Sequence, residues 1–282
     1  MTDTIVRDDA AAEVRRPQRR SAGTAATSVR TFLAVLWRDI FVTGRELLPF
    51  LAQVVIQPFF LLFIFGKVLG SIGYTGGAFT QVLLPGIVSL NGFIGALQNT
   101  TMPLVLDFSW TREIEDRLLA PMPISLVAVE KMIFGALRGI VSALLMVPIG
   151  FLILPGVRWP ASALPGAVGL VVLGSLVGAA IGMTIGTLVS ARRINITFAV
   201  ILTPLMFTGS TQFPLLALTH VRWFQVVCAI NPLTYFSEGM RALLLPGRVH
   251  SLPLCLDLLV LVFACLLFGA FGIKGFMRRA LD

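Results

Sequence analysis

Six long apolar stretches constrain the fold of this chain more than any other feature of its sequence. A helix needs about 20 mainly apolar residues to cross a lipid bilayer. We therefore expect membrane-spanning helices over residues 47–69, 78–106, 124–154, 163–189, 196–212 and 254–277. The composition agrees, because 56% apolar residues, 13% charged residues and a mean hydropathy of +0.90 do not suit a soluble globule. The sequence predicts an all-α membrane protein with six transmembrane helices.

The N-terminal region differs from the spans and divides into two parts. Residues 1–28 are rich in Ala, Thr, Ser and Arg and lack the apolar run of a cleaved signal peptide, so we expect a disordered cytoplasmic tail. Residues 29–46 contain a helically spaced apolar series with charged residues elsewhere around the helix. This pattern predicts an amphipathic interfacial helix, followed by a six-span domain over residues 47–282.

The distribution of Lys and Arg predicts the orientation. Sixteen of them lie before residue 47, in 107–131, at 192–193 and in 274–279, which the six spans place on one side of the membrane. Arg138 falls within the third span, and five residues lie on the other side: Lys67, Arg158, Arg222, Arg241 and Arg248. Because positive loops stay in the cytoplasm, both termini are expected there, with the chain in a bacterial inner membrane.

The segment 213–253, between the fifth and sixth spans, is neither a clean span nor a polar loop. It contains two apolar helical pieces separated by Asn231 and Pro232. Irregular backbone at membrane depth requires cover by protein or a water-filled cavity. We predict two short extracytoplasmic re-entrant helices in this segment.

Polar amides within the first two spans are candidate substrate contacts. Gln53 and Gln57 lie four residues apart in the first span, and Asn91, Gln98 and Asn99 lie in the second. Because amides are costly in lipid, these side chains should face the bundle interior, a subunit interface or a substrate path. The alternative interpretation is interhelical hydrogen bonding.

Glycines in the fourth span form a ridge with a period of four: Gly174, Gly178, Gly182 and Gly186. Such a ridge permits close contact between helices. The ridge either packs the fourth span statically within one subunit or lets a neighbouring helix slide along it and open a substrate path.

Several functions are excluded by missing residues. The deep spans hold almost no carboxylates or histidines for an ion relay. The Gly66-Lys67 pair is followed by Val68, so it is not a phosphate-binding loop, and no catalytic constellation is present. The net charge of +8 is not combined with exposed aromatics in a soluble segment, which argues against nucleic acid. We expect no enzyme activity, cofactor or metal site in this chain.

The three cysteines do not form a metal-binding or CxxC pattern. Cys228, Cys255 and Cys265 are therefore expected to be small buried residues. A disulfide between Cys228 and Cys255 on the outer side is the alternative.

Two segments resemble a known family. Residues 113–125 (EIEDRLLAPMPIS), with 213–218 (FPLLAL), 230–235 (INPLTY) and Met240-Arg241, resemble the type-2 permeases of ATP-binding-cassette transporters, similar to the daunorubicin-resistance type. Many members have Gly-Thr-Leu where this chain has residues 113–115 (EIE). The outer motif that the resemblance assigns consists of Asn231, Pro232, Tyr235, Glu238 and Arg241.

The resemblance implies a half-transporter that pairs with a second permease copy, in a homodimer or a heterodimer, and with a separate ATPase that hydrolyses ATP. Residues 29–46 look like the family's connecting helix. Residues 111–121 look like its coupling helix, which docks on the ATPase through Arg112, Glu113, Glu115, Asp116 and Arg117. Export of a hydrophobic drug or lipid-like compound is the expected function. The alternatives are a polysaccharide or glycolipid exporter and a non-transporting membrane scaffold.

Overall fold

The computed structural model describes residues 25–45, 47–73, 77–108, 123–154 and 156–281. In these residues the chain forms helices and turns and no strand, as the all-α prediction requires. The main helices are α1 (Ala25–Arg45), α2 (Leu47–Leu62), α4 (Gly77–Leu106), α6 (Ile124–Ile153), α7 (Leu164–Leu188), α8 (Ile194–Thr208), α9 (Arg222–Ile230), α10 (Pro232–Leu244) and α11 (Leu254–Leu281). A π-helical turn (Phe63–Val68) and the short α3 (Leu69–Ser71) continue α2.

Among the described residues, five helical segments are long and apolar enough to cross a membrane: Phe50–Ser71, Phe79–Leu106, Ile124–Ile153, Ala161–Leu188 and Leu254–Leu281. They correspond to five of the six predicted spans. The segment predicted as the fifth span forms α8, which has 15 residues. At 1.5 Å per residue that length is about 22 Å, short of the roughly 30 Å hydrocarbon core. The helix ends early because the chain turns at Gly209 and Ser210.

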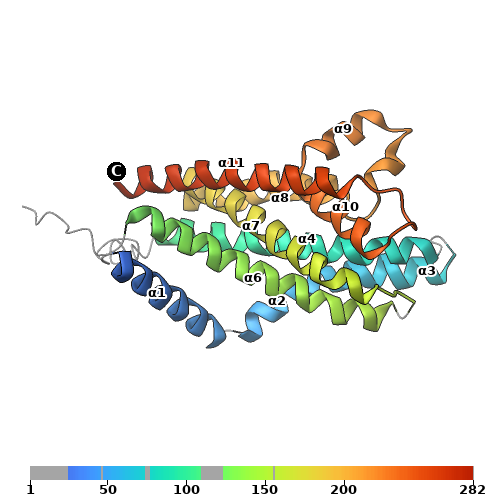
Figure 1. Ribbon diagram of the computed structural model, residues 1–282, viewed down its shortest axis with the longest axis horizontal. Coiled ribbons are helices and arrows are strands. Elements are labelled where there is room, and N and C mark those ends of the chain that lie inside the picture. The colour runs from blue at the N-terminus through green and yellow to red at the C-terminus, as the bar shows by residue number, and fades with distance from the viewer. Residues whose placement is uncertain (1–24, 46, 74–76, 109–122, 155, 282) are drawn as a thin grey trace, which may run out of the picture.

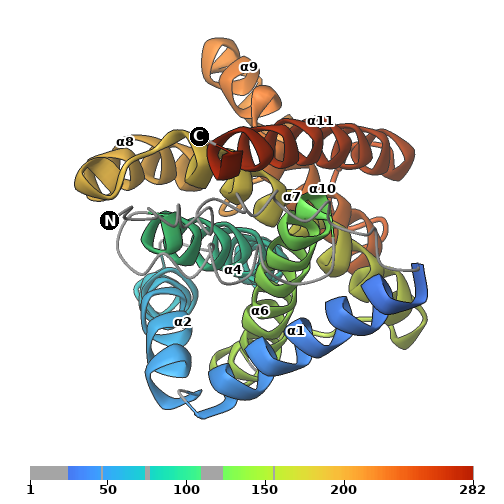
Figure 2. The same ribbon diagram turned by 90° about the vertical axis from the view of Figure 1, so that its left-hand side faces the viewer.

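The bundle is built around α4 and α7. In the most apolar window of α4, 83% of the residues are buried, against 67% for α7 and 22% for α2 and for α11. Viewed end on, α6 and α11 lie beside α7, whereas α2 and α8 lie on the other side of α4 (Figure 2). The central pair is therefore enclosed by its own chain, and the outer helices are not.

Three of the four predicted ridge glycines lie at the contact between these two central helices: Gly178, Gly182 and Gly186. The fourth, Gly174, faces Phe236 of α10. Side chains on Gly178 and Gly182 would collide with the backbone carbonyls of Phe93 and Leu97 in α4. The Thr101 hydroxyl of α4 donates a 2.9 Å hydrogen bond to the Gly182 carbonyl. This arrangement supports the interpretation as static packing within one subunit.

The predicted amphipathic helix forms α1, which lies at one end of the bundle, with α9 near the opposite end (Figure 1). Phe32 and Val35 pack on a cluster that includes Leu104 and Phe276. On the other face, large apolar side chains are exposed with helical spacing: Val29, Leu33, Trp37, Ile40 and Phe41. We call these two ends of the bundle the α1 end and the α9 end.

The segment between α8 and α11 contains two short helices, as predicted, but they differ in their surroundings. The helix α9 stands away from the bundle (Figures 1 and 2) and exposes Trp223, Val226 and Ile230. The helix α10 packs against α4, α7 and α11, and nine of its residues are buried, among them Phe236 and Met240. Only α9 therefore has an apolar face available to lipid or to a partner.

All three cysteines are free in the described structure. Cys228 is buried, as expected for a small core residue, Cys265 is partly buried and Cys255 is exposed. Burial raises the pKa of the Cys228 thiol, and its contact with Ser210 opposes that shift.

Candidate functional site

A small pocket of about 40 Å³, open at its mouth, lies between α2, α4 and α8. Four of the five predicted amide residues line it: Gln57, Asn91, Gln98 and Asn99. Apolar side chains form most of the remaining wall: Val54, Pro58, Leu61, Leu90, Ile94 and Met206. The pocket thus combines an apolar wall with convergent amides, which is typical of small-molecule sites.

Within the described part of the chain, Asn91 and Asn99 each donate a hydrogen bond to a backbone carbonyl. The Asn91 Nδ2 donates to the Ser142 carbonyl of α6 at 2.8 Å, and the Asn99 Nδ2 donates to the Gly95 carbonyl of its own helix at 2.7 Å. Asn91 therefore makes the interhelical hydrogen bond of the alternative interpretation and also lines the pocket. Gln57 is exposed on α2, and the side chain of Gln53 lies outside the described residues.

Sequence reasoning missed Met206 as a pocket residue. It belongs to α8, which the sequence places far from α2 and α4. No local signal identifies a lone Met on an apolar helix as a wall residue, because the pairing of helices across the bundle is a tertiary property.

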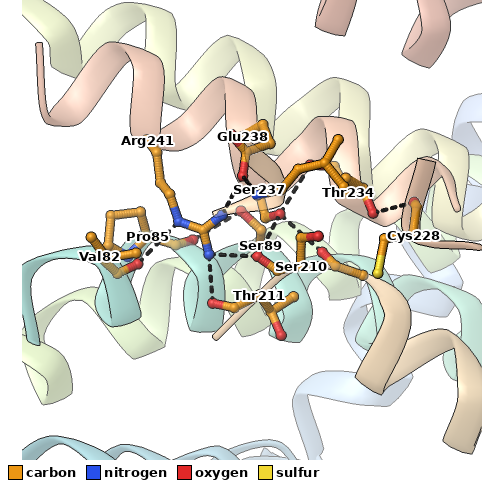
Figure 3. A network of polar contacts seen from close by, with 12 residues as sticks. Val82, Pro85, Ser89, Ser210, Thr211, Cys228, Thr234, Ser237, Glu238 and Arg241 are labelled. Atoms are coloured by element: carbon orange, nitrogen blue, oxygen red, sulfur yellow. Dashed lines mark hydrogen bonds and ion pairs between the residues drawn. The ribbon is translucent and has the colours of Figure 1, made fainter. Parts of the chain in front are cut away.

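A second polar site lies near the α9 end, where Arg241 of α10 is completely buried. Its Nη1 donates to Glu238 Oε1 at 2.8 Å, and its Nη2 donates to the carbonyls of Ser210 and Thr211 at 2.6 and 2.8 Å (Figure 3). Its Nε donates to the Val82 carbonyl of α4 at 3.3 Å. The guanidinium therefore joins α10, α4 and the turn after α8.

That turn is shaped to present carbonyl groups to the arginine. Ser210 has a φ of 47°, a left-handed conformation that is uncommon for a residue other than glycine. Its neighbour Thr211 packs so closely on α4 that any side chain on Gly86 would collide with the Thr211 carbonyl. Gly86 is therefore required for the approach of the turn to α4.

The rest of the predicted outer motif shapes the start of α10. Asn231 accepts a hydrogen bond from the Leu233 amide at 3.0 Å, so it caps the helix, and Pro232 follows at the first helical position. The Asn231 Nδ2 also donates to the Leu205 carbonyl of α8 at 2.7 Å. The Tyr235 hydroxyl donates to the Ala229 carbonyl of α9 at 2.7 Å. These residues fix α8, α9 and α10 to one another.

The ion pair of Arg241 and Glu238 corrects one part of the sequence analysis. Both side chains are 0% exposed, so Arg241 is not a loop charge on the outer side. Burial lowers the pKa of the Arg241 guanidinium, and the Glu238 carboxylate opposes that shift. Without Arg241, the predicted charge asymmetry is sixteen to four.

The predicted ATPase-coupling residues Arg112, Glu113, Glu115, Asp116 and Arg117 lie outside the described residues. The structure does describe the bundle on both sides of them. Asp107 after α4 forms a buried 2.8 Å ion pair with Lys131 of α6. The Phe108 ring lies 5.5 Å from that of Phe276 in α11.

Arg279 adds a further contact at this end. Its guanidinium lies 4.7 Å from the centre of the Phe108 ring, and its Nη1 donates to carbonyls at the end of α7, those of Gly186, Thr187 and Val189. The ends of α4, α7 and α11 are thereby joined at the α1 end of the bundle.

Five apolar helices around a glycine-packed centre define this chain as a multi-pass membrane protein. Its family is shown by comparison with known proteins. The family model described as ABC-2 type transporter matches residues 30–245, and the chain belongs to this family. A comparison with curated proteins finds no match. The family assigns the chain to the membrane permease component of an ATP-binding-cassette transporter, and it implies an ATPase partner.

Proposed function

We propose that this chain is the permease subunit of an ATP-driven exporter that moves a hydrophobic drug or lipid-like compound out of the cytoplasm. The observation that carries this proposal is the pocket between α2, α4 and α8. Its apolar wall suits an apolar compound, and its amides supply a few hydrogen bonds that fix orientation.

The lining of the pocket favours this substrate class over a polysaccharide. Sugar rings bind well on aromatic faces, yet no aromatic residue lines the pocket in the described part of the chain. A glycolipid with a large apolar part remains compatible with the site. The non-transporting scaffold has no observation in its favour.

A second permease copy would complete the path. Exposed apolar side chains lie on the two helices that flank the pocket: Ile56 and Phe60 on α2, and Ile196, Val200 and Phe207 on α8. Burial of this surface against another copy would enclose the pocket mouth. We propose a homodimer in the bacterial inner membrane, with α1 lying in the membrane interface. Both termini are proposed to be cytoplasmic, which requires that α8 and the turn after it complete a sixth crossing.

The coupling to ATP is proposed to run through residues 111–121. The segment connects α4 to α6, and the Asp107–Lys131 pair and the Phe108 contacts hold its flanks to the bundle. A displaced segment would move these helices as rigid bodies. Charge reversal of Glu113, Glu115 and Asp116 together should uncouple hydrolysis from export in a reconstituted complex. Unchanged transport would contradict this role.

The pocket is tested with the permease purified together with its ATPase partner. A screen identifies compounds that stimulate hydrolysis, and the variant Gln98→Ala should raise the concentration for half-maximal stimulation several-fold. The loss of one hydrogen bond, about 0.5–1.5 kcal/mol, sets this size.

The matched control is Gln81→Ala, which removes an amide from the same helix. Gln81 lies outside the pocket, where it accepts a hydrogen bond from Arg248. If both variants respond equally, or if no apolar compound stimulates hydrolysis, the proposed path is wrong.

A further inference from the structure

Asp257 is buried without a partner in the first turn of α11. Its exposed fraction is 0%, and neither carboxyl oxygen has a hydrogen-bond partner among the described residues. The carboxyl faces α10, where a Cβ on Gly239 would lie 3.6 Å from Oδ2. The absence of a side chain on Gly239 allows this close approach.

The charged groups around Asp257 do not compensate a negative charge. On α10, Glu238 is a like charge, and its Oε2 has no hydrogen-bond partner among the described residues. The neighbouring phenol of Tyr235 supplies no positive charge. Arg241 is the cation of that helix, and its donors serve Glu238 and three backbone carbonyls. The helix α7, which packs on α11, contains no ionisable residue in its sequence. The helix α6 also packs on α11 and contains Glu130, Lys131 and Arg138. Its neighbouring residues Val127 and Ala128 cluster with Phe276, near the opposite end of α11 from Asp257. Arg248 and His250, in the loop before α11, are exposed.

Two ionised carboxylates beside one guanidinium would leave one uncompensated negative charge in the interior. The N-terminus of α11 favours an anion, but this effect is small compared with the cost of burying an unpaired carboxylate. A bound metal ion is a poor way to neutralise this charge on chemical grounds, because metal sites need several ligands. No group of three or more His, Cys, Asp or Glu residues is found in the described structure. A hard cation also prefers six or more oxygen ligands. A proton neutralises the carboxyl with no further ligand.

We propose that Asp257 is a proton-binding site, which is protonated at neutral pH and holds α11 against α10. Release of the proton places a second negative charge beside Glu238 and weakens this contact. The site lies near the α9 end, where α10 also contacts α4 and α7. It does not rest on the proposed substrate or direction of transport, since it concerns the chain by itself.

The direct test is infrared spectroscopy of the full chain in lipid vesicles at neutral pH, with aspartate carboxyl carbons labelled with ¹³C. A protonated carboxyl has a carbonyl stretch separate from the bands of carboxylates. We expect one such band that shifts with the label in the wild-type protein. No label-sensitive band would overturn the proposal, and this measurement needs no variant.

The variant Asp257→Asn imitates the neutral carboxyl in size and should remove the band. The control is Asp39→Asn in the exposed helix α1, which should retain it. If Asp257→Asn keeps the band, the proton resides on another aspartate and the assignment is wrong.

Thermal stability against pH gives a second readout. A carboxyl that binds a proton more tightly in the folded state stabilises the fold at low pH, and this contribution is lost as pH rises through the folded-state pKa. The wild-type unfolding temperature should therefore fall towards alkaline pH more than that of Asp257→Asn. Equal pH profiles would contradict the proposal.

Discussion

The two sides of α4 show how differently one helix can be packed. On the side of α7 and α10, glycines bring backbones into contact and Arg241 bonds to the Val82 carbonyl. On the side of α2 and α8, the same helix borders an open pocket. In α8, Ile194 and Leu202 are the two buried residues. We call the side of α4 that faces α7 and α10 the closed side, because its packing is complete within one chain. The side that faces α2 and α8 is the open side, because part of it borders the pocket.

This difference separates a scaffold from a surface that is available for function. Close backbone contacts leave few alternative arrangements, so α4, α7 and α10 should behave as one rigid body. The contacts of α2 and α8 with α4 enclose empty space, which a substrate or a moving helix can occupy. The predictions below test the two sides in order of expected effect.

The largest effect is expected for Arg241→Met on the closed side. The change leaves the buried Glu238 carboxylate and three backbone carbonyls without their donor. Breaking a buried ion pair in this way costs about 3–5 kcal/mol. The variant should lose most of its monodisperse peak in size-exclusion chromatography after mild heating.

The double variant Glu238→Gln with Arg241→Met distinguishes charge from packing. It removes the stranded carboxylate, so its unfolding temperature should lie above that of Arg241→Met alone. If the decrease in unfolding temperature of the double variant equals the sum of the decreases of the two single variants, the ion pair is not the source of the effect. The network would then hold the scaffold through the carbonyl contacts of Arg241.

The closed side was partly predictable from the sequence. The period-four glycines indicated a close helix contact, and the Asn231-Pro232 pair indicated the start of a helix. The burial of Arg241 was not predictable, because its acceptors Ser210 and Thr211 lie about 30 residues earlier and meet it only through the turn after α8. The burial of Asp257 was not predicted either, because its contact with Gly239 of α10 also depends on tertiary packing.

The open side was predictable in its chemistry but not in its shape. Amides seven residues apart, such as Asn91 and Gln98, share a helix face by simple periodicity. That this face meets α2 and α8 depends on tertiary packing. The length of α8 was predicted too long, since apolar composition does not reveal where a turn such as Ser210 ends a helix.

A smaller effect is expected for Gly178→Ala at the centre of the closed side. The new methyl group would collide with the Phe93 carbonyl, which belongs to the backbone and cannot rotate away. Overpacking of this kind costs about 1–3 kcal/mol. The matched control is Gly169→Ala in the same helix, where a Cβ meets nothing within 4 Å. Thermal unfolding in detergent should show a lower midpoint for the first variant and an equal or higher one for the second.

The smallest effect is expected for Leu61→Ala in the pocket wall. Leu61 is partly exposed and borders space that is already empty, so its truncation enlarges the pocket and leaves no new enclosed cavity. We expect a loss of stability of about 0.5 kcal/mol, as for a surface position. The control is Leu97→Ala on α4, because Leu97 is 0% exposed in the main core cluster and its truncation should cost about 2–5 kcal/mol. Unfolding midpoints measured side by side decide the outcome. Equal losses for the two variants would mean that α2 is as firmly packed as the centre, and that α4 does not have one closed and one open side.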